Sequence, residues 1–240
     1  LCISDIHGNT EVLDKLDDVF KSVDAVLFAG DFAECFKPET GREALDKLCK
    51  KHDTIFAVLG NCDNEDFLED LEDQDVCVEN TLVFHEGLAF AGSGGGTKFT
   101  GKTEFERTEE EVMSDFNIVL NSVEQTGDKS LWNSLILVSH NPPVGKGIDS
   151  FDGEHHAGSQ KFTDFINENQ PLAVVCGHIH EGVGIEKFGD FDKPLNIEES
   201  TFGLIINASS PLGLGIDEAS AITNVKLLET KLNGEDLVFP

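Results

Sequence analysis

Short apolar runs alternate with amphipathic stretches of helical length over the first sixty residues. The pattern predicts strands over residues 1–4, 25–29 and 55–59, and helices over 10–21 and 39–51. Strands that alternate with helices through short connections are typical of a parallel sheet. The first quarter of the chain therefore predicts an α/β fold.

Two further strands are predicted over residues 81–85 and 88–91, and Glu86-Gly87 between them indicates a hairpin turn. The other predicted elements are a helix over 108–123 with Thr108 at its N-cap, a strand over 135–138, a helix over 159–169, a strand over 172–175, and strands and turns from about residue 202. No internal repeat or low-complexity linker interrupts this order. Residues 1–240 are therefore expected to form a single domain.

Acidic residues dominate the charged positions. The chain has 46 Asp and Glu against 17 Lys and Arg, and its formal net charge is −29. Net charge affects solubility and partners rather than fold. The excess indicates either a solvated surface, as suits a salt-rich cytoplasm, or attraction for a basic partner. It opposes nucleic-acid binding, whose affinity comes mostly from basic side chains that neutralise phosphates.

The six cysteines contain no CxxC pair, and most of them lie in apolar runs. Free Cys behaves there as a small hydrophobic residue, so all six are expected to be reduced, as in the cytoplasm. The sequence shows no signal peptide and no apolar run near the roughly 20 residues that span a membrane. These features predict a cytoplasmic protein that does not bind a membrane.

Five of the apolar runs are followed directly by side chains that can bind metal ions. These side chains are Asp5, His7, Asp31, Asn61, His140, His178 and His180. In open α/β sheets, ligands bind beyond the carboxyl ends of the strands. Each motif alone is typical of a turn or a cap, but five in this order favour one shared site.

The donor set would comprise two carboxylates, four imidazoles and one amide oxygen. This mixture suits Mn, Fe, Zn or Ni, and it is too rich in His for a Mg or Ca site. Seven side chains exceed the needs of one ion. Two divalent metal ions that share a ligand are the simplest arrangement.

The ordered motifs DIH, GDFAE, GNCD, SH and GHIH, between residues 5 and 180, resemble the calcineurin-like metallophosphoesterase superfamily. The pattern of that superfamily is DxH, GDxx(E), GN(H)D, H and GHxH. The GNCD form resembles a branch of small bacterial and archaeal phosphodiesterases. The resemblance implies a four-layer α/β/β/α sandwich with two metal ions at its edge.

The resemblance also implies a role for each ligand. The first ion would be bound by Asp5, His7, Asp31 and His180, and the second by Asp31, Asn61, His140 and His178. Asp31 would bridge the two ions. The implied enzyme is a metal-dependent phosphoric ester hydrolase, in which a metal-bridging hydroxide attacks small phosphodiesters or phosphomonoesters. The preferred substrate and the oligomeric state stay open.

The motif Gly60-Asn61-Cys62-Asp63 departs from the family pattern. Cys62 replaces the His that would protonate the leaving group or stabilise charge, with Asp63 orienting it. A thiol is a weak hydrogen-bond donor and a poorer general acid. Cys62 is therefore expected either to line the site or to pack within the fold. Asp31, Asn61, Cys62 and Asp63 form the candidate catalytic set together with one further His.

That further residue is His156, which resembles the His of an H-x-G-S element in one branch of the family. We expect it to contact the phosphate or the leaving group. The adjoining Gly158-Ser159 precedes a predicted helix, and N–H groups at a helix N-terminus favour phosphate. Ser159 is therefore a candidate substrate-binding residue, as is Asn61.

A Gly-rich loop over residues 92–100 resembles the substrate-facing loop of the same branch, and it lacks the spacing of a P-loop. Lys98 in this loop is a candidate phosphate contact. Two alternatives remain beside a small-ester hydrolase. One is a nuclease, which the acidity disfavours. The other is a non-catalytic protein-binding scaffold of the same fold, similar to the retromer subunit, although such scaffolds tend to lose ligands.

Overall fold

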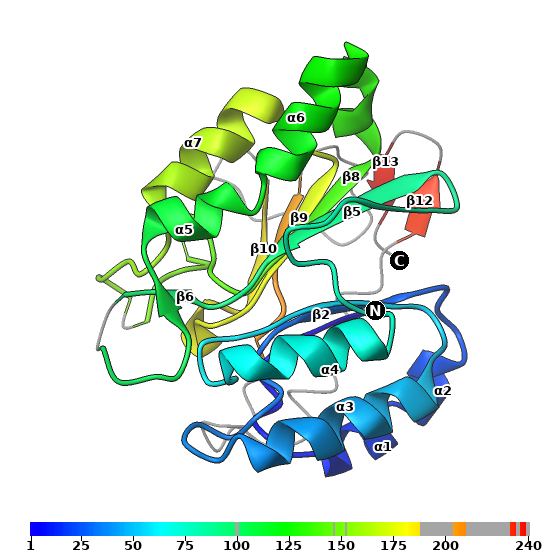
Figure 1. The fold of residues 1–240 in the computed structure, drawn as a ribbon, viewed down its shortest axis with the longest axis vertical. Helices are drawn as coiled ribbons and strands as arrows, with labels where there is room; N and C mark the ends of the chain where they lie inside the picture. The colour runs from blue at the N-terminus through cyan, green and yellow to red at the C-terminus, as the bar shows by residue number, and fades with distance from the viewer. Residues whose placement is uncertain are drawn as a thin grey trace.

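Two β-sheets lie face to face in the computed structural model of the chain, and helices cover the outer face of each sheet (Figure 1). The structure describes residues 1–98, 101–145, 147–151, 153–187, 204–209, 231–233 and 236–238. The layer order is helices, sheet, sheet, helices. The predicted four-layer α/β/β/α sandwich is confirmed.

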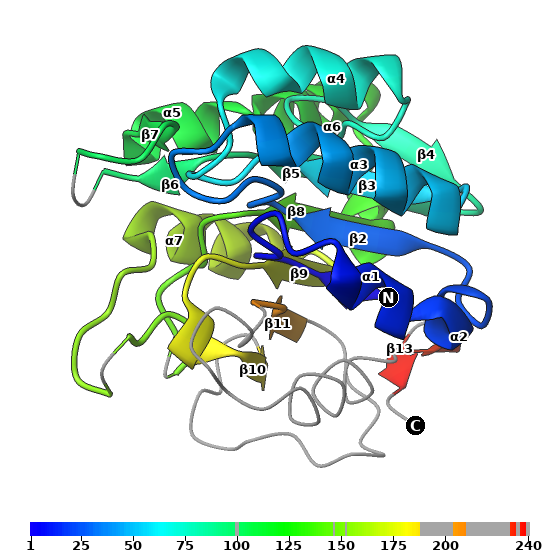
Figure 2. The same cartoon turned by 90° about the horizontal axis from the view of Figure 1, so that it is seen from below.

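The first sheet has three parallel strands in chain order: β1 (Cys2–Ile3), β2 (Val26–Ala29) and β3 (Ile55–Val58). Its outer face is covered by α1 (Glu11–Lys15), α2 (Asp17–Phe20), α3 (Glu39–Lys51) and α4 (Leu68–Asp73). Figure 2 shows the molecule from the side of these helices. The predicted parallel pairing of the first three strands is confirmed.

The second sheet has six strands in the order β10-β11-β9-β8-β5-β4. They are β4 (Val83–His85), β5 (Leu88–Ser93), β8 (Leu135–Ser139), β9 (Ala173–Cys176), β10 (Gly184–Lys187) and β11 (Leu204–Asn207). The four inner strands are parallel, and both edge strands pair antiparallel. The covering helices are α5 (Glu109–Ser114), α6 (Asn117–Thr126) and α7 (Gln160–Asn169).

Shorter elements complete the described part of the fold. They are η1 (Glu65–Phe67), β6 (Gly96–Thr97), β7 (Glu106–Arg107), η2 (Lys129–Ser134), η3 (His180–Gly182), β12 (Lys231–Asn233) and β13 (Asp236–Val238). The strands and turns predicted from about residue 202 correspond to β11, β12 and β13, and the rest of that segment lies outside the described residues. Among the described residues, no helix combines the length and apolar character needed to cross a membrane.

Alternation along the strands divides the apolar side chains into separate cores. Leu27 and Ala29 pack between the two sheets, whereas Val26 and Phe28 pack against the helices of the first sheet. Side chains on a strand point to opposite faces in turn, so one strand serves two cores. The inter-sheet core includes the stacked rings of Phe56 and Phe90, whose centroids are 3.8 Å apart.

Two predicted helices are each split in the structure. The helix predicted over 10–21 divides at Leu16 into α1 and α2, yet Leu13, Leu16 and Phe20 all stay buried. The helix predicted over 108–123 divides at Asp115 into α5 and α6. Asp115 ends α5 and accepts a hydrogen bond from Arg107 Nη1 at 2.6 Å. At this break Phe116 N donates to Met113 O at 3.2 Å, so the chain makes a tighter turn than an α-helix does.

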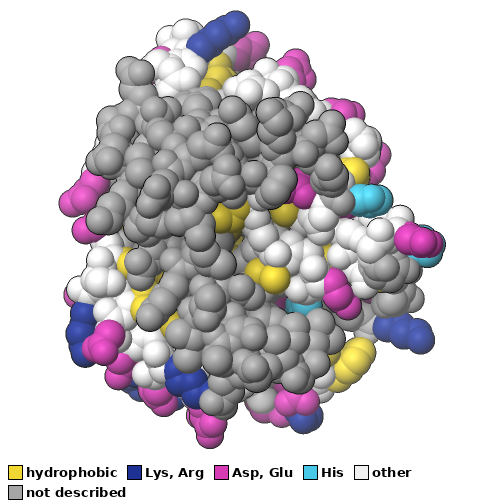
Figure 3. Space-filling model, turned by 180° about the vertical axis from the view of Figure 1, so that it is seen from behind, with side chains coloured by type: hydrophobic (Ala, Val, Ile, Leu, Met, Phe, Trp, Pro, Cys, Tyr) yellow, Lys and Arg dark blue, Asp and Glu magenta, His cyan; other side chains and the backbone are white. Residues whose placement is uncertain are grey.

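Other local predictions are confirmed. Thr108 caps α5 through a capping box with Glu111. The hairpin at Glu86-Gly87 forms, with both residues in the left-handed region at φ 47° and 84°. On the face in Figure 3, the described Asp and Glu side chains lie at separate points around the surface, interspersed with Lys and Arg.

Candidate metal centre

The structure brings the predicted ligands together at the carboxyl ends of strands from both sheets. Asp5 and His7 follow β1, Asp31 follows β2, Asn61 follows β3, His140 follows β8, and His178 and His180 follow β9. The parallel strands end at one edge, so residues far apart in sequence meet there. Each sheet supplies part of the set.

Four of these residues have left-handed backbone conformations. Asp5, His7, Asp31 and His178 have φ values of 56°, 45°, 59° and 73°. Such a conformation costs a non-Gly residue roughly 1–3 kcal/mol and persists where the surroundings enforce it. Hydrogen bonds from Asp5 N to Gly30 O (2.9 Å) and from His7 N to Asp31 O (3.0 Å) hold the first loop against the second.

One half of the cluster centres on two imidazoles that face each other. His7 Nε2 lies 3.2 Å from His180 Nε2, and His180 Nε2 lies 3.3 Å from Asp5 Oδ1. His7 Nε2 also lies 3.7 Å from Asp31 Oδ2. Ala33 O can only accept a hydrogen bond, so His7 Nδ1, 3.3 Å away, donates to it. In neutral His7 the lone pair on Nε2 then points into the cluster.

The other half centres on His140, which is fully buried. Its Nδ1 lies 2.7 Å from Ala29 O and therefore donates, which leaves the Nε2 lone pair of the neutral ring toward Asn61 Oδ1 at 2.8 Å. His140 Nε2 is also 3.6 Å from Asp31 Oδ2. Two acceptors that face each other at such a distance are suited to a shared cation. The donor set thus fits metal ions.

Electrostatics support the same interpretation. Burial, with the charges of Asp5 and Asp63, raises the pKa of Asp31 well above its usual range. Burial also acts to raise the pKa of Asp5, but the hydrogen bond with His180 and the nearby imidazoles outweigh it and lower that pKa. Burial lowers the pKa of His178 to about 3, which favours the neutral, ligating form. A divalent cation would relieve the repulsion between the buried carboxylates.

Asp63 joins the loops that follow β2 and β3 through its carboxylate. Its carboxylate accepts hydrogen bonds from the backbone N–H groups of Ala33 (2.7 Å), Gly60 (2.7 Å) and Phe32 (3.2 Å). It is fully buried. Its described contacts fix the loops that carry Asp31 and Asn61 relative to each other.

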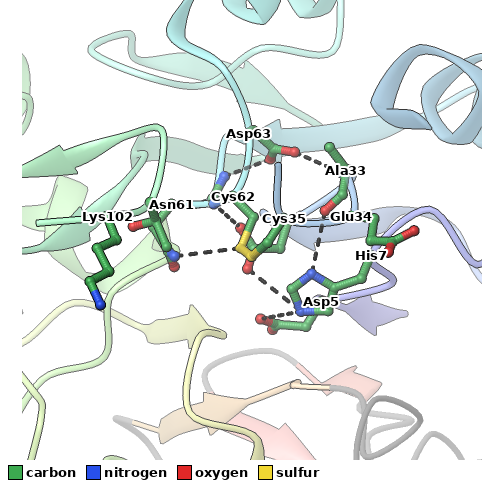
Figure 4. Close-up of a disulfide and its surroundings, with 12 residues drawn as sticks. Asp5, His7, Ala33, Glu34, Cys35, Asn61, Cys62, Asp63 and Lys102 are labelled. Atoms are coloured by element: carbon green, nitrogen blue, oxygen red, sulfur yellow. Dashed lines mark hydrogen bonds and ion pairs between the residues drawn. A yellow bond between two sulfur atoms is a disulfide. The ribbon is translucent and has the colours of Figure 1, made fainter. Parts of the chain in front are cut away.

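Cys62 forms a disulfide with Cys35, which corrects the expectation that all six cysteines are reduced (Figure 4). The two residues are 27 apart in sequence, and no CxxC spacing announces the pair. Their loops meet because β2 and β3 are neighbours in the sheet. A disulfide sulfur carries no proton, so Cys62 in this state cannot serve as a general acid. Cys62 does line the site, since its N–H donates to Asp31 Oδ1 at 2.8 Å.

His156 is held by Asp149, a residue that the sequence did not single out. His156 Nδ1 lies 2.8 Å from Asp149 Oδ1, and the His156 side chain is 42% exposed. Asp149 is fully buried and also accepts from the N–H groups of Gly145 (3.0 Å) and Gly158 (3.1 Å). The carboxylate therefore fixes the ring through Nδ1, and Nε2 is the ring nitrogen outside this contact.

The N–H groups expected to bind phosphate near Ser159 are already occupied, which corrects that expectation. Gly158 N donates to Asp149 Oδ2 at 3.1 Å, and Ser159 N donates to Pro142 O at 2.9 Å. Ser159 Oγ accepts from Phe162 N as the N-cap of α7 and donates to Glu109. The buried Ser159 thus serves the helix start.

A cavity of about 310 Å³ lies beside the cluster. Its lining residues are Thr97, Lys98, Phe151, Ala157, His178, Ile179, His180 and Glu181. Lys98 is exposed, and its N–H donates to Arg107 O at 2.9 Å. The structure therefore places Lys98 and the predicted ligands His178 and His180 around one cavity. Phe99 and Thr100 of the same loop lie outside the described residues.

Comparison with known proteins gives the family. A family model described as calcineurin-like phosphoesterase matches residues 1–182. An uncharacterized protein of Methanocaldococcus jannaschii is 33% identical over 196 residues, which are 78% of this chain and 83% of that protein. A UPF0046 protein of Caenorhabditis elegans is 24% identical over 212 residues, which are 77% of this chain and 52% of that protein.

A solved structure shares the fold. The crystal structure of TT1561 of Thermus thermophilus superposes with a TM-score of 0.60 at 17% identity. The match covers 86% of this chain and 87% of that one. The two-sheet sandwich is therefore common to both chains.

Proposed function

The chain belongs to the calcineurin-like phosphoesterase family of metal-dependent phosphoric ester hydrolases, and we propose from this premise that it hydrolyses small phosphate esters with two divalent ions. The observation that carries the proposal is the convergence of ligands from both sheets on the buried Asp31. When bound, the ions would supply Lewis-acid charge for phosphoryl oxygens and acidify an attacking water.

We assign the ligands in two sets that share Asp31. Asp5, His7 and His180 lie on one side of it, and Asn61 and His140 lie on the other. We place His178 in the second set because its ring lies beside that of His140, with centroids 5.0 Å apart. Asp31 Oδ2 lies near a nitrogen of each set, His7 Nε2 at 3.7 Å and His140 Nε2 at 3.6 Å, which supports its role as the bridge.

The chain's own residues keep these donors in place. Backbone carbonyls of Ala29 and Ala33 orient the imidazoles of His140 and His7 through their Nδ1 atoms. Such outer contacts fix the tautomer and the aim of a metal-binding His. Asp63 acts as a positioning residue for the loops of Asp31 and Asn61.

The cavity beside the cluster supports a small substrate. Its volume of about 310 Å³ is at the lower end of the range for small-molecule sites. Lys98 at its wall offers a positive charge to a phosphate oxygen, within a chain of net charge −29. A compact phosphomonoester or phosphodiester suits this site better than a nucleic acid does.

Proton delivery to the leaving group is assigned to His156. The Asp149 carboxylate holds its Nδ1, so Nε2 is the atom that would hold the proton for the departing oxygen. The neighbouring Ala157 lines the cavity beside His178 and His180. His156 would then take the place that the family gives to the His of GNHD.

The test uses metal-stripped protein restored with Mn²⁺, Zn²⁺ or Ni²⁺ and compares bis-p-nitrophenyl phosphate with p-nitrophenyl phosphate. We expect turnover that needs the metal, and Asp31→Asn should reduce it by more than the roughly 100-fold that the loss of an outer contact costs. Asp24→Asn, at an exposed carboxyl, is the matched control and should keep full turnover.

Each failure has its own meaning. Turnover that Asp31→Asn leaves intact would remove the assigned centre. Two bound ions without turnover of either ester would point to a narrower substrate. Failure to bind any of the three ions would favour the protein-binding scaffold instead.

A further inference from the structure

The Cys35–Cys62 disulfide joins two loops that each carry a ligand of the assigned metal centre. Cys35 lies four residues after Asp31 in the loop that follows β2, and Cys62 directly follows Asn61 in the loop after β3. The Cα atoms of the two cysteines are 4.6 Å apart, within the range of about 4.4–6.8 Å that allows a bridge. The backbone thus places the pair for bonding.

The disulfide lies against the cluster itself. Cys62 N donates to Asp31 Oδ1 at 2.8 Å, and Asn61 Nδ2 lies 3.6 Å from Cys62 Sγ. The sulfurs of both cysteines and a ring nitrogen of His7 all lie within 4.8 Å of one another. Figure 4 shows the sulfurs between Asn61 and His7. A change of bonding at sulfur would therefore act on three assigned ligands.

Exposure differs between the two cysteines. Cys62 is buried, with 3% of its surface exposed, whereas Cys35 is partly exposed. Cys35 lies within the turn that Lys37 N closes on Glu34 O, beside Phe36, which is 64% exposed and has φ 66°. An attacking thiolate can therefore reach Sγ of Cys35 from solvent more readily than that of Cys62.

We propose that Cys35 and Cys62 form a redox site that exchanges with small dithiol reductants and sets how firmly the metal centre holds its ions. A reductant thiolate attacks Cys35 Sγ, the S–S bond breaks, and Cys62 leaves as a thiolate that takes a proton from solvent. The second thiol of the reductant then releases Cys35 and closes its own disulfide. The reductant loses two electrons, and the protein gains two thiols.

The consequence for the ions follows from the loops. The bridge ties the loop of Asp31 to the loop of Asn61 beyond the hydrogen bonds of Asp63. Reduction removes this tie, so the two ligands lose part of their shared orientation. Outer contacts of this kind are worth about 10–100-fold in metal affinity. This inference rests on the metal centre assigned above.

The experiment combines a thiol count with Mn²⁺ affinity, and neither needs turnover. Denatured protein that has met no reductant should show four reactive thiols, those of Cys2, Cys49, Cys77 and Cys176. Treatment with dithiothreitol should raise the count to all six cysteines. Competition with a chelator should then show Mn²⁺ affinity about 10-fold lower in the reduced protein.

Two variants complete the design. Cys35→Ser should show the lower Mn²⁺ affinity in both redox states, and Cys49→Ser, in α3, should respond to reduction as the unchanged chain does. Six reactive thiols before reduction would overturn the redox site. Four thiols with equal Mn²⁺ affinity in both states would overturn its control of the ions. If neither redox state bound Mn²⁺, the assigned metal centre would be wrong, and so would its regulation by the disulfide. The thiol count would still test the disulfide itself.

Discussion

At the scale of single residues, the site depends on the residues that position the side chains of the site as much as on those side chains themselves. Asp149 and Asp63 are both fully buried, and each fixes a neighbour through several hydrogen bonds. Asp63 accepts hydrogen bonds from backbone N–H groups, so it fixes the conformation of loops. Asp149 contacts both backbone N–H groups and the His156 ring, so it also orients that imidazole. The two carboxylates therefore predict different responses to substitution.

We expect His156→Ala to affect esters according to their leaving group. General-acid help contributes about 10²–10⁴-fold where the leaving group is a poor one. The kcat of an alkyl phosphate ester should therefore fall within that range, while hydrolysis of a nitrophenyl ester should change little. Asp149→Asn should show the same preference with a smaller loss, because the ring remains but loses its orientation. Equal loss with both esters would contradict a proton-donating role.

The candidate ligands could be predicted from the sequence because each follows an apolar strand, and the structure brings these residues together. Sequence reasoning missed Asp149 and Cys35, because their partners are reached only through folded loops. Asp149 meets His156, which lies seven positions further along the chain, and Cys35 meets Cys62 because two strands are neighbours. Local periodicity predicted α3 and α7 well. It did not predict the break at Asp115, where the chain makes a tighter turn than an α-helix does.

At the scale of elements, Glu79 connects the end of β3 to the Gly-rich loop after β5. Its carboxyl accepts from Leu59 N, and a Cβ on Gly94 would collide with Glu79 Oε1. Burial, reinforced by the charge of Asp115, raises the pKa of Glu79 to about 8. The loop therefore packs tightly on a carboxyl that favours its protonated form.

This pKa gives stability a pH dependence of definite sign. Unfolded Glu releases its proton near pH 4.5 and folded Glu79 near pH 8, so the folded state holds the extra proton between these values. The stability due to this group is full below pH 4.5 and is lost as the pH rises through 8. Glu79→Gln cannot ionise. Between these pH values its free energy of unfolding should therefore rise relative to that of the unchanged chain, by up to about 1.4 kcal/mol per pH unit.

Urea unfolding at several pH values from 5 to 8 checks this expectation. Glu39→Gln, at an exposed position at the start of α3, is the matched control and should give a curve parallel to that of the unchanged chain. Parallel curves for Glu79→Gln as well would show that the Glu79 carboxyl keeps an ordinary pKa in the folded state.

At the scale of the whole molecule, the net charge of −29 affects the stability of the folded state. Repulsion among like charges destabilises a compact chain. Raising KCl from about 0.1 M to about 1 M shortens the screening length from roughly 10 Å to 3 Å. The folded state should therefore become more stable in concentrated salt.

We expect Tm to rise by about 3 °C or more over this range, which corresponds to about 1 kcal/mol for a chain of this size. Potassium acetate at the same ionic strength should give the same rise. A shift that depends on the anion, or a fall in Tm, would argue against screening as the cause.

The assigned ligands are divided between the two sheets. The number of bound ions would therefore report whether the two sheets are packed together. Asp5, His7, Asp31 and Asn61 belong to one half of the sandwich, and His140, His178 and His180 belong to the other. Any bound ion that takes donors from both halves acts as a clamp, and its binding energy strengthens their union. Mutations in the inter-sheet core, such as at Phe56 or Phe90, would loosen the packing between the sheets. On heating, such variants would then lose their ions at a lower temperature than the one at which the chain unfolds.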